Sequence, residues 1–106
     1  GASRGIGRAI ARRCAERGAR LWLTARDAGS LAPVLAEVRA QGAEAEALAL
    51  DLVDPAAIAA LAAALREEPL EVLVNNAGAA ESAPFLRTDD ALFERMLAIN
   101  CTGPFR

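Results

Sequence analysis

The chain opens with a glycine-rich stretch that could bind a phosphate. Residues 1–7 read GASRGIG and run directly into an amphipathic segment that we predict to be a helix. Glycines at positions 1, 5 and 7 let the backbone turn tightly and approach a ligand closely. A helix start offers unpaired N–H groups and about half a positive charge, the environment that a pyrophosphate prefers. A tight turn that binds nothing is the alternative, but the strand–helix–strand spacing that follows favours binding.

Two arginines bear on the identity of the ligand. After the apolar run 21–24, Arg26 stands near the position where a protein that prefers NAD usually has an acidic residue for the ribose hydroxyls. A guanidinium group attracts a 2′-phosphate, and Arg4 in the glycine-rich stretch supplies a second one. Asp27 is a displaced acidic alternative. The pattern favours NADP(H) over NAD(H) as the cofactor.

Polar residues also follow two later apolar runs. Asp51 follows the run 45–50, and the sequence Asn-Asn-Ala-Gly at 75–78 follows the run 71–74. Asn100 lies on an otherwise apolar face of the last predicted helix, where a buried Asn needs hydrogen-bond partners. Each also has a purely structural interpretation. Asp51 could cap a helix, residues 75–78 could form a turn, and Asn100 could bridge helix backbone.

The elements that must position these residues alternate between short apolar runs and longer amphipathic stretches, which predicts an α/β fold. Apolar strands separated by helices indicate a parallel sheet, and right-handed crossovers favour a doubly wound Rossmann fold. The expected strands are residues 21–24, 45–50 and 71–74. We expect this fold to be incomplete, with the first strand and the C-terminal half missing. Residues 1–106 then make one partial NAD(P)-binding Rossmann domain.

Local signals predict where the helices begin, end and face. The expected N-terminal caps are Ser30, Asp54 before Pro55, and Thr88. The expected left-handed helix ends are Gly18 and Gly42. The side chains expected to face inward are Ile6, Ile10 and Cys14 in the first helix, Leu31, Val34, Leu35 and Val38 in the second, and Phe93, Met96 and Leu97 in the last.

In order and spacing, these pieces resemble the short-chain dehydrogenase/reductase family across nearly the whole chain. The most discriminating piece is the Asn-Asn-Ala-Gly sequence at 75–78, preceded by Glu71-Val72-Leu73-Val74. Within the family, Arg4, Arg26 and this asparagine sequence are typical of the 3-oxoacyl-thioester reductase type. The resemblance implies hydride transfer between a nicotinamide cofactor and a carbonyl or alcohol carbon.

The resemblance also implies a role for each matching residue. The implied cofactor-binding residues are Gly1, Ser3, Arg4, Ile6, Gly7, Arg26, Asp51, Leu52, Asn76, Ala77 and Gly78. The glycine-rich stretch would line the pyrophosphate and the adenosine ribose, Asp51 and Leu52 would meet the adenine, and residues 76–78 would lie along the nicotinamide-side ribose. Asn100 is the implied catalytic residue, which holds a water of the proton relay.

The family's proton-transfer residues have no counterpart in these 106 residues. All twelve basic residues are arginine, and the chain has no Lys, His or Tyr. In the family a Tyr acts as general acid/base, and a Lys lowers its pKa from about 10. The family places both beyond residue 106, so we expect the full-length protein to be the oxidoreductase. The alternatives are a non-catalytic NAD(P)-binding sensor or pseudoenzyme and, less favoured because of its different glycine spacing, a sugar-nucleotide epimerase.

Composition argues against several other functions. A net charge of −2 gives no basic field for nucleic acid or an anionic membrane. Cys14 and Cys101 lack metal-ligand spacing, so we expect no metal site. No signal peptide or long apolar run is present, which favours a cytoplasmic location. The expected partners are a small carbonyl or alcohol substrate and, by family analogy, further copies of the full-length protein.

Overall fold

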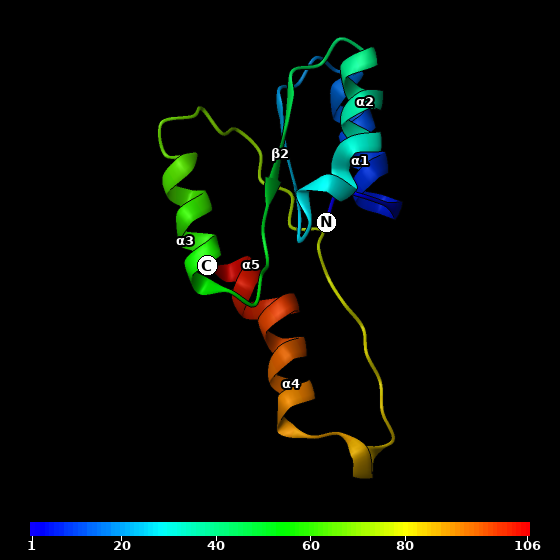
Figure 1. The fold of residues 1–106 in the computed structure, drawn as a ribbon, viewed down its shortest axis with the longest axis vertical. Coiled ribbons are helices and arrows are strands. Elements are labelled where there is room, and N and C mark those ends of the chain that lie inside the picture. Colours follow the sequence, from blue (N-terminus) through cyan, green and yellow to red (C-terminus); the bar gives the residue numbers. More distant parts are fainter. The chain divides into compact units, whose positions relative to one another are not determined.

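The computed structural model describes residues 1–106, apart from the side chain of Phe85. The chain forms two compact units, residues 1–51 and residues 52–106 (Figure 1).

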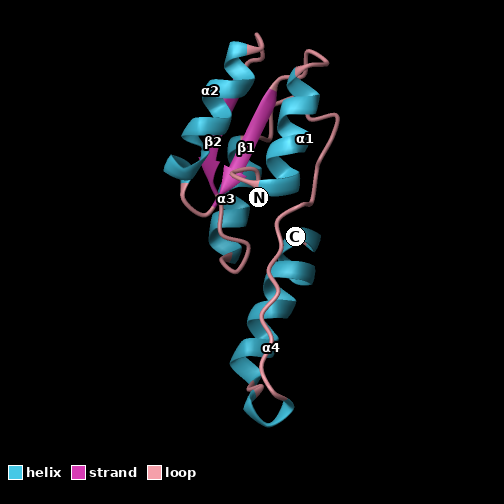
Figure 2. Ribbon diagram, turned by 90° about the vertical axis from the view of Figure 1, so that its right-hand side faces the viewer, coloured by secondary structure: helices cyan, strands magenta, loops and turns pink.

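The first unit is a small α/β structure. Strands β1 (Leu21–Ala25) and β2 (Ala45–Ala49) pair in parallel, with Leu21 opposite Ala45. Helices α1 (Gly5–Ala15) and α2 (Ala32–Ala40) pack against each other on one side of this pair (Figure 2). A single 3₁₀ turn, η1 (Ala28–Leu31), leads into α2. The predicted α/β fold with a parallel sheet is therefore confirmed.

The core of this unit comes mainly from η1 and α2. Leu31, Val34 and Val38 are fully buried, as their helical spacing predicts, and Leu35 is half-buried. They pack with buried residues of β1, β2 and α1. The most deeply buried residues of the unit thus lie in η1 and α2, the elements that follow β1 in the chain.

The buried face of α1 differs from the predicted one. Gly7, Ala11 and Ala15 are buried, whereas Ile6 is 73% exposed and Ile10 and Cys14 are only half-buried. The prediction was wrong by one residue because α1 packs against α2 and β1, where small residues permit a close approach of the backbones.

One predicted N-terminal cap and both predicted glycine helix ends are confirmed, whereas the other two predicted N-terminal caps are replaced by a nearby carboxylate. The Asp54 carboxylate accepts hydrogen bonds from Ala56 N at 2.8 Å and Ala57 N at 3.2 Å, before α3 (Pro55–Ala64). Gly18 and Gly42 end their helices with φ of +78° and +88°.

Ser30 and Thr88 do not cap helices. Asp27 caps η1, and Ser30 Oγ instead donates to the Asp27 carbonyl at 2.6 Å. Asp89 caps α4 (Asp90–Leu97) by accepting from Leu92 N at 2.8 Å. In both cases an Asp close to the predicted cap is better placed to meet the first free N–H groups, and a carboxylate is a strong cap.

The second unit is mostly helical. It contains α3, a 3₁₀ turn η2 (Phe85–Arg87), α4, a π-helical turn η3 (Ala98–Thr102) and a final turn α5 (Gly103–Phe105). Phe93 and Leu97, predicted to face inward, are 62% and 42% exposed. Among the described helices, none has the length and apolar character needed to cross a bilayer.

The expected strand at 71–74 is absent from the described structure. This segment has no regular secondary structure, and Val72 and Leu73 are 76% and 79% exposed. Residues 72–74 are apolar, but a strand forms only where a neighbouring strand pairs with its backbone. The described sheet consists of β1 and β2 alone.

Candidate functional site

The glycine-rich stretch lies beside the carboxyl end of β1. The Gly1 amino group and Ala2 N both donate to the Thr24 carbonyl, at 2.6 and 3.1 Å. Thr24 is the penultimate residue of the strand. Ligands of open α/β sheets bind at this edge, outside the carboxyl ends of the strands.

The hydrogen-bond pattern also fixes on which side of β1 the stretch lies. Leu21 N donates to the Glu44 carbonyl at 2.9 Å, and the Ala25 carbonyl accepts from Leu50 N at 2.8 Å. Because alternate residues of a parallel strand bond to the same neighbour, the Thr24 carbonyl points away from β2. The glycine-rich stretch therefore lies on the side of β1 opposite β2.

The start of α1 is open to an anion. Arg4 precedes the helix in an extended conformation, with φ −155° and ψ 173°, and no side chain of the described residues caps the helix. Gly5 has φ +55°, a left-handed conformation that favours glycine. The first turn holds no acidic residue. Free N–H groups and the positive end of the helix dipole thus face the sheet edge, with no carboxylate in the first turn of α1 itself.

Arg26 and Asp51 reach the same edge of the sheet. Arg26 directly follows β1, and Asp51 follows β2 by two residues, after Leu50 has bonded to the end of β1. Arg4 and Arg26 are exposed, and neither forms an ion pair within the described chain. Ser3 and Asp51 are half-buried. The first unit thus brings together the glycine-rich stretch, both arginines and Asp51.

An ion pair between α1 and α2 supports this arrangement. Arg8 Nε donates to Glu37 Oε2 at 3.0 Å, and a second bond joins Arg8 Nη2 to Glu37 Oε1. This hydrogen bonding lowers the pKa of the Glu37 carboxyl below its ordinary value and raises the pKa of Arg8. No local sequence pattern indicates this pair, because 29 residues separate the partners. It ties α2 to the helix whose start forms the candidate site.

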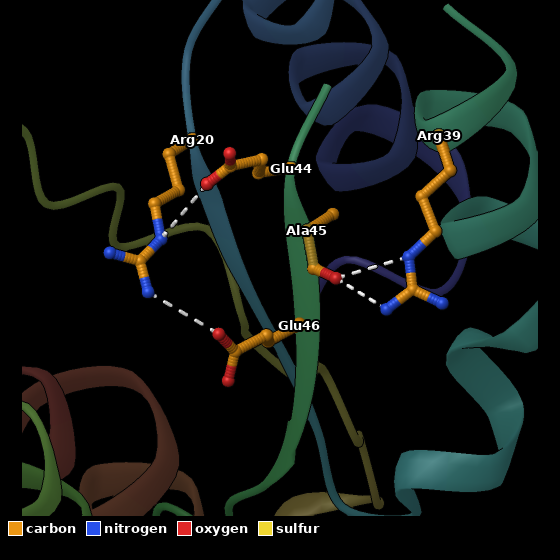
Figure 3. A network of polar contacts seen from close by, with 5 residues as sticks. All are labelled: Arg20, Arg39, Glu44, Ala45 and Glu46. Atoms are coloured by element: carbon orange, nitrogen blue, oxygen red, sulfur yellow. Dashed lines mark hydrogen bonds and ion pairs between the residues drawn. The ribbon is translucent and has the colours of Figure 1, made fainter. Parts of the chain in front are cut away.

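A second polar network lies at the amino ends of the strands, away from the carboxyl edge (Figure 3). Arg20 contacts Glu44 at 3.7 Å and Glu46 at 3.4 Å, and its guanidinium lies 4.4 Å from the centre of the Trp22 ring. On the other side of β2, Arg39 donates to the Ala45 carbonyl at 3.2 Å from Nε and 2.5 Å from Nη2. These contacts link the strands to neighbouring segments, and none of them involves a candidate cofactor-binding residue.

In the second unit, Asn100 connects the loop after the Asn-Asn-Ala-Gly sequence to the last helix. Its Oδ1 accepts from Ala79 N at 3.1 Å, and its Nδ2 donates to the carbonyls of Ala79 at 2.8 Å and Met96 at 3.0 Å. A Cβ at Gly78 would lie 3.0 Å from Asn100 Oδ1. We predicted that Asn100 is buried, but the structure shows it exposed. Its side chain nevertheless has hydrogen-bond partners, as predicted.

The location of Asn100 in a π-helical turn is also informative. The turn η3 interrupts the helix between α4 and α5, and such turns occur often at functional sites. Asn76 and Ala77 are half-buried in the preceding loop. Leu52 is half-buried against Gly103, where a Cβ would meet the Leu52 carbonyl at 2.5 Å. The need for glycine at position 103 could not be inferred from the sequence.

Comparison with known proteins identifies the family. The family model described as short chain dehydrogenase matches residues 1–106. The chain belongs to the short-chain dehydrogenase family. The resemblance inferred from the glycine-rich stretch, the arginines and the asparagine sequence is therefore confirmed.

Individual relatives of this short-chain dehydrogenase chain include two enzymes. It is 41% identical to the L-tagatose-forming galactitol 2-dehydrogenase of Cereibacter sphaeroides, over 99% of this chain and 41% of that protein. It is 37% identical to the 3-oxoacyl-acyl-carrier-protein reductase of rhamnolipid biosynthesis from Pseudomonas aeruginosa, again over 99% of this chain and 41% of the relative. The chain thus spans about two fifths of the length of these relatives.

Solved structures agree with this assignment. A metagenomic short-chain oxidoreductase in complex with NADP superposes with a TM-score of 0.93 at 44% identity, covering 99% of this chain and 49% of that one. A short-chain dehydrogenase from Sphingobium yanoikuyae in complex with NADPH gives a TM-score of 0.89 at 42% identity, covering 97% and 41%. The chain therefore has a partial Rossmann-type fold of this family.

Proposed function

We propose that the full-length protein is an NADP(H)-dependent oxidoreductase that transfers a hydride between nicotinamide and a carbonyl or alcohol substrate. The observation that carries this proposal is the uncapped start of α1, held at the carboxyl edge of the sheet with Arg4 and Arg26 exposed nearby. Two similar solved structures, which are complexes with NADP and NADPH, support it. Bound NADP(H) supplies the hydride donor or acceptor of the reaction.

The residues of the first unit fit the adenosine half of such a cofactor. Backbone amides at the start of α1, from the stretch that includes Gly1, Ser3, Ile6 and Gly7, bind the pyrophosphate. Arg4 and Arg26 bind the 2′-phosphate through charge-assisted hydrogen bonds. The Asp51 carboxylate would accept from the adenine amino group. Leu52, the first residue of the second unit, is a separate candidate for contact with the adenine ring.

The second unit provides the nicotinamide-side residues. Asn76, Ala77 and Gly78 lie along the ribose in this proposal, and Asn100 holds the following residue in place through Ala79. Asn100 also holds a water of the proton relay. The acid/base Tyr and its neighbouring Lys come from outside residues 1–106, because this segment contains neither.

Titration of the full-length protein with NADPH and NADH tests the proposal. We expect NADPH to bind more tightly, and we expect Arg26→Asp to reverse the preference. Loss of one charge-assisted contact of about 1.5–3 kcal/mol weakens NADPH binding by about tenfold to 100-fold. Arg17→Asp is the matched control, since Arg17 is exposed beyond the far end of α1 and bears the same charge. Equal affinities for the two nucleotides contradict the role of the arginines, and no affinity for either contradicts the function.

A non-catalytic NAD(P)-binding sensor or pseudoenzyme is the second candidate. It is favoured only by the absence of Tyr and Lys from residues 1–106. A Tyr-x-x-x-Lys sequence in the remainder of the protein, together with oxidation of NADPH in the presence of a carbonyl substrate, decides for the oxidoreductase.

We further propose a cytoplasmic, homo-oligomeric protein. Both cysteines, Cys14 and Cys101, are free thiols, as expected in a reducing compartment. Assembly rests on analogy with the family, and sedimentation of the full-length protein tests it.

A further inference from the structure

Asp27 is adjacent in sequence to Arg26, one of the two arginines of the candidate cofactor site. It follows Arg26 directly, two residues beyond the end of β1 and at the carboxyl edge of the sheet. An acidic residue in this region has two possible tasks in a nucleotide-binding fold. It can accept hydrogen bonds from the ribose hydroxyls of NAD(H), or it can cap the helix that follows.

The contacts of Asp27 point to the second task. Its Oδ1 accepts from Gly29 N at 2.9 Å, and its backbone carbonyl accepts from Ser30 N at 3.2 Å and Ser30 Oγ at 2.6 Å. A Cβ at Gly29 would lie only 3.2 Å from Asp27 Oδ1, so the carboxylate lies close over the backbone of the turn. No ion pair joins Asp27 to Arg26, although the two are adjacent described residues with opposite charges.

The cap connects the cofactor edge to the most deeply buried part of the first unit. The capped turn η1 ends at Leu31, which is fully buried and leads without a break into α2. Val34 and Val38 of α2 are fully buried as well. The backbone that carries Arg26 is therefore fixed to the core through the Asp27 cap.

The charge of Asp27 is not needed for this cap. Asn and Asp cap helices about equally well, because each presents an oxygen to the free N–H groups. The negative charge nevertheless stands beside a residue proposed to bind a dianionic phosphate, and like charges repel even in a partly screened environment. NAD(H) lacks that phosphate and is not subject to this repulsion.

We infer that Asp27 is a positioning residue that caps the turn before α2, and that its charge limits the preference of the protein for NADP(H) over NAD(H). This inference rests on the proposed nucleotide-binding function. It predicts that the geometry and the charge of Asp27 act separately and that different substitutions will reveal each of them.

Two variants of the full-length protein separate the cap from the charge. Asp27→Asn keeps the cap and removes the charge, so NADPH should bind about threefold more tightly, as expected for one screened like charge, while NADH affinity stays within about twofold. Asp27→Ala removes both, so Tm should fall by about 2–4 °C and the Gly29 amide should exchange its hydrogen faster. Asp27→Asn should retain the wild-type Tm and exchange rate.

The control variant is Asp89→Asn, because Asp89 caps α4 in the same way and is not a candidate cofactor residue. It should leave both nucleotide affinities unchanged. Three results overturn the inference. The first is that Asp27→Asn weakens NADH binding tenfold and leaves NADPH binding unchanged, because this identifies Asp27 as a ribose ligand. The second is that Asp27→Asn leaves both affinities unaltered. The third is that Asp27→Ala retains the wild-type Tm. Failure of the proposed function itself is distinguishable, because the wild-type protein then binds neither nucleotide.

Discussion

The two units of the chain differ in how much of a buried core their own residues form. All buried hydrophobic residues of the described chain lie in residues 1–51, where two strands and two helices enclose Leu31, Val34 and Val38. In residues 52–106, Gly103 is the one buried residue among those described, and Val72 and Leu73 are largely exposed. The comparison indicates that the unit with the glycine-rich stretch has a buried core of its own, whereas the apolar segment at 72–73 of the second unit is exposed.

The largest effect should come from the core of the first unit. Leu31→Ala removes a fully buried side chain, and such substitutions lower the free energy of unfolding by about 2–5 kcal/mol. Leu86→Ala is the control, because Leu86 is 94% exposed in the structure. Denaturant titration of the full-length protein measures both variants. A Leu86→Ala loss as large as that of Leu31→Ala would show that the second unit acquires a core of equal weight in the full-length protein.

Much of the first unit could be predicted from its sequence because its elements are specified locally. The helix ends at Gly18 and Gly42, the parallel strands and the stripe of α2 all follow from residue types at fixed spacing. The face of α1 could not be predicted in this way. The hydrophobic pattern predicts that Ile6 faces inward. In the structure the smaller residues Gly7, Ala11 and Ala15 are buried instead, because they permit close packing of the helices.

The candidate site shows the same division between local and long-range information. The glycine-rich stretch and the bonding capacity of Asn100 were predicted from residue type and position. The Arg8–Glu37 pair and the contact of Gly103 with Leu52 join residues far apart in sequence, so no local pattern reveals them. The prediction of a strand at 71–74 was wrong for a related reason. Strand pairing depends on a neighbouring strand and not on the apolar run alone.

An intermediate effect is expected at Gly103, the one buried residue among those described in the second unit. A Cβ there would lie 2.5 Å from the Leu52 carbonyl and 2.7 Å from the Ala98 carbonyl, both of which are backbone atoms. Gly103→Ala should therefore lower the free energy of unfolding by about 1–3 kcal/mol through overpacking. Ala91→Gly in the exposed part of α4 is a control for general effects on helix propensity, at about 1 kcal/mol. Wild-type stability of Gly103→Ala would mean that the contact with Leu52 is absent from the full-length protein.

The smallest effect should come from the Arg8–Glu37 pair, which lies on the surface of the first unit rather than in its core. The pKa of Glu37 is lowered in the folded state, first through its hydrogen bond with Arg8, so the charged carboxylate stabilises the fold. This contribution is fully present above the unfolded pKa of about 4.3 and is lost as the pH falls through the lower folded pKa. The difference in stability between the wild type and Glu37→Gln should therefore be constant near neutral pH and shrink below about pH 4.3. Glu16→Gln is a suitable control, because its partner Arg13 lies on the same helix turn and not on α2. A difference that persists unchanged to low pH would show that the ion pair does not hold α1 against α2.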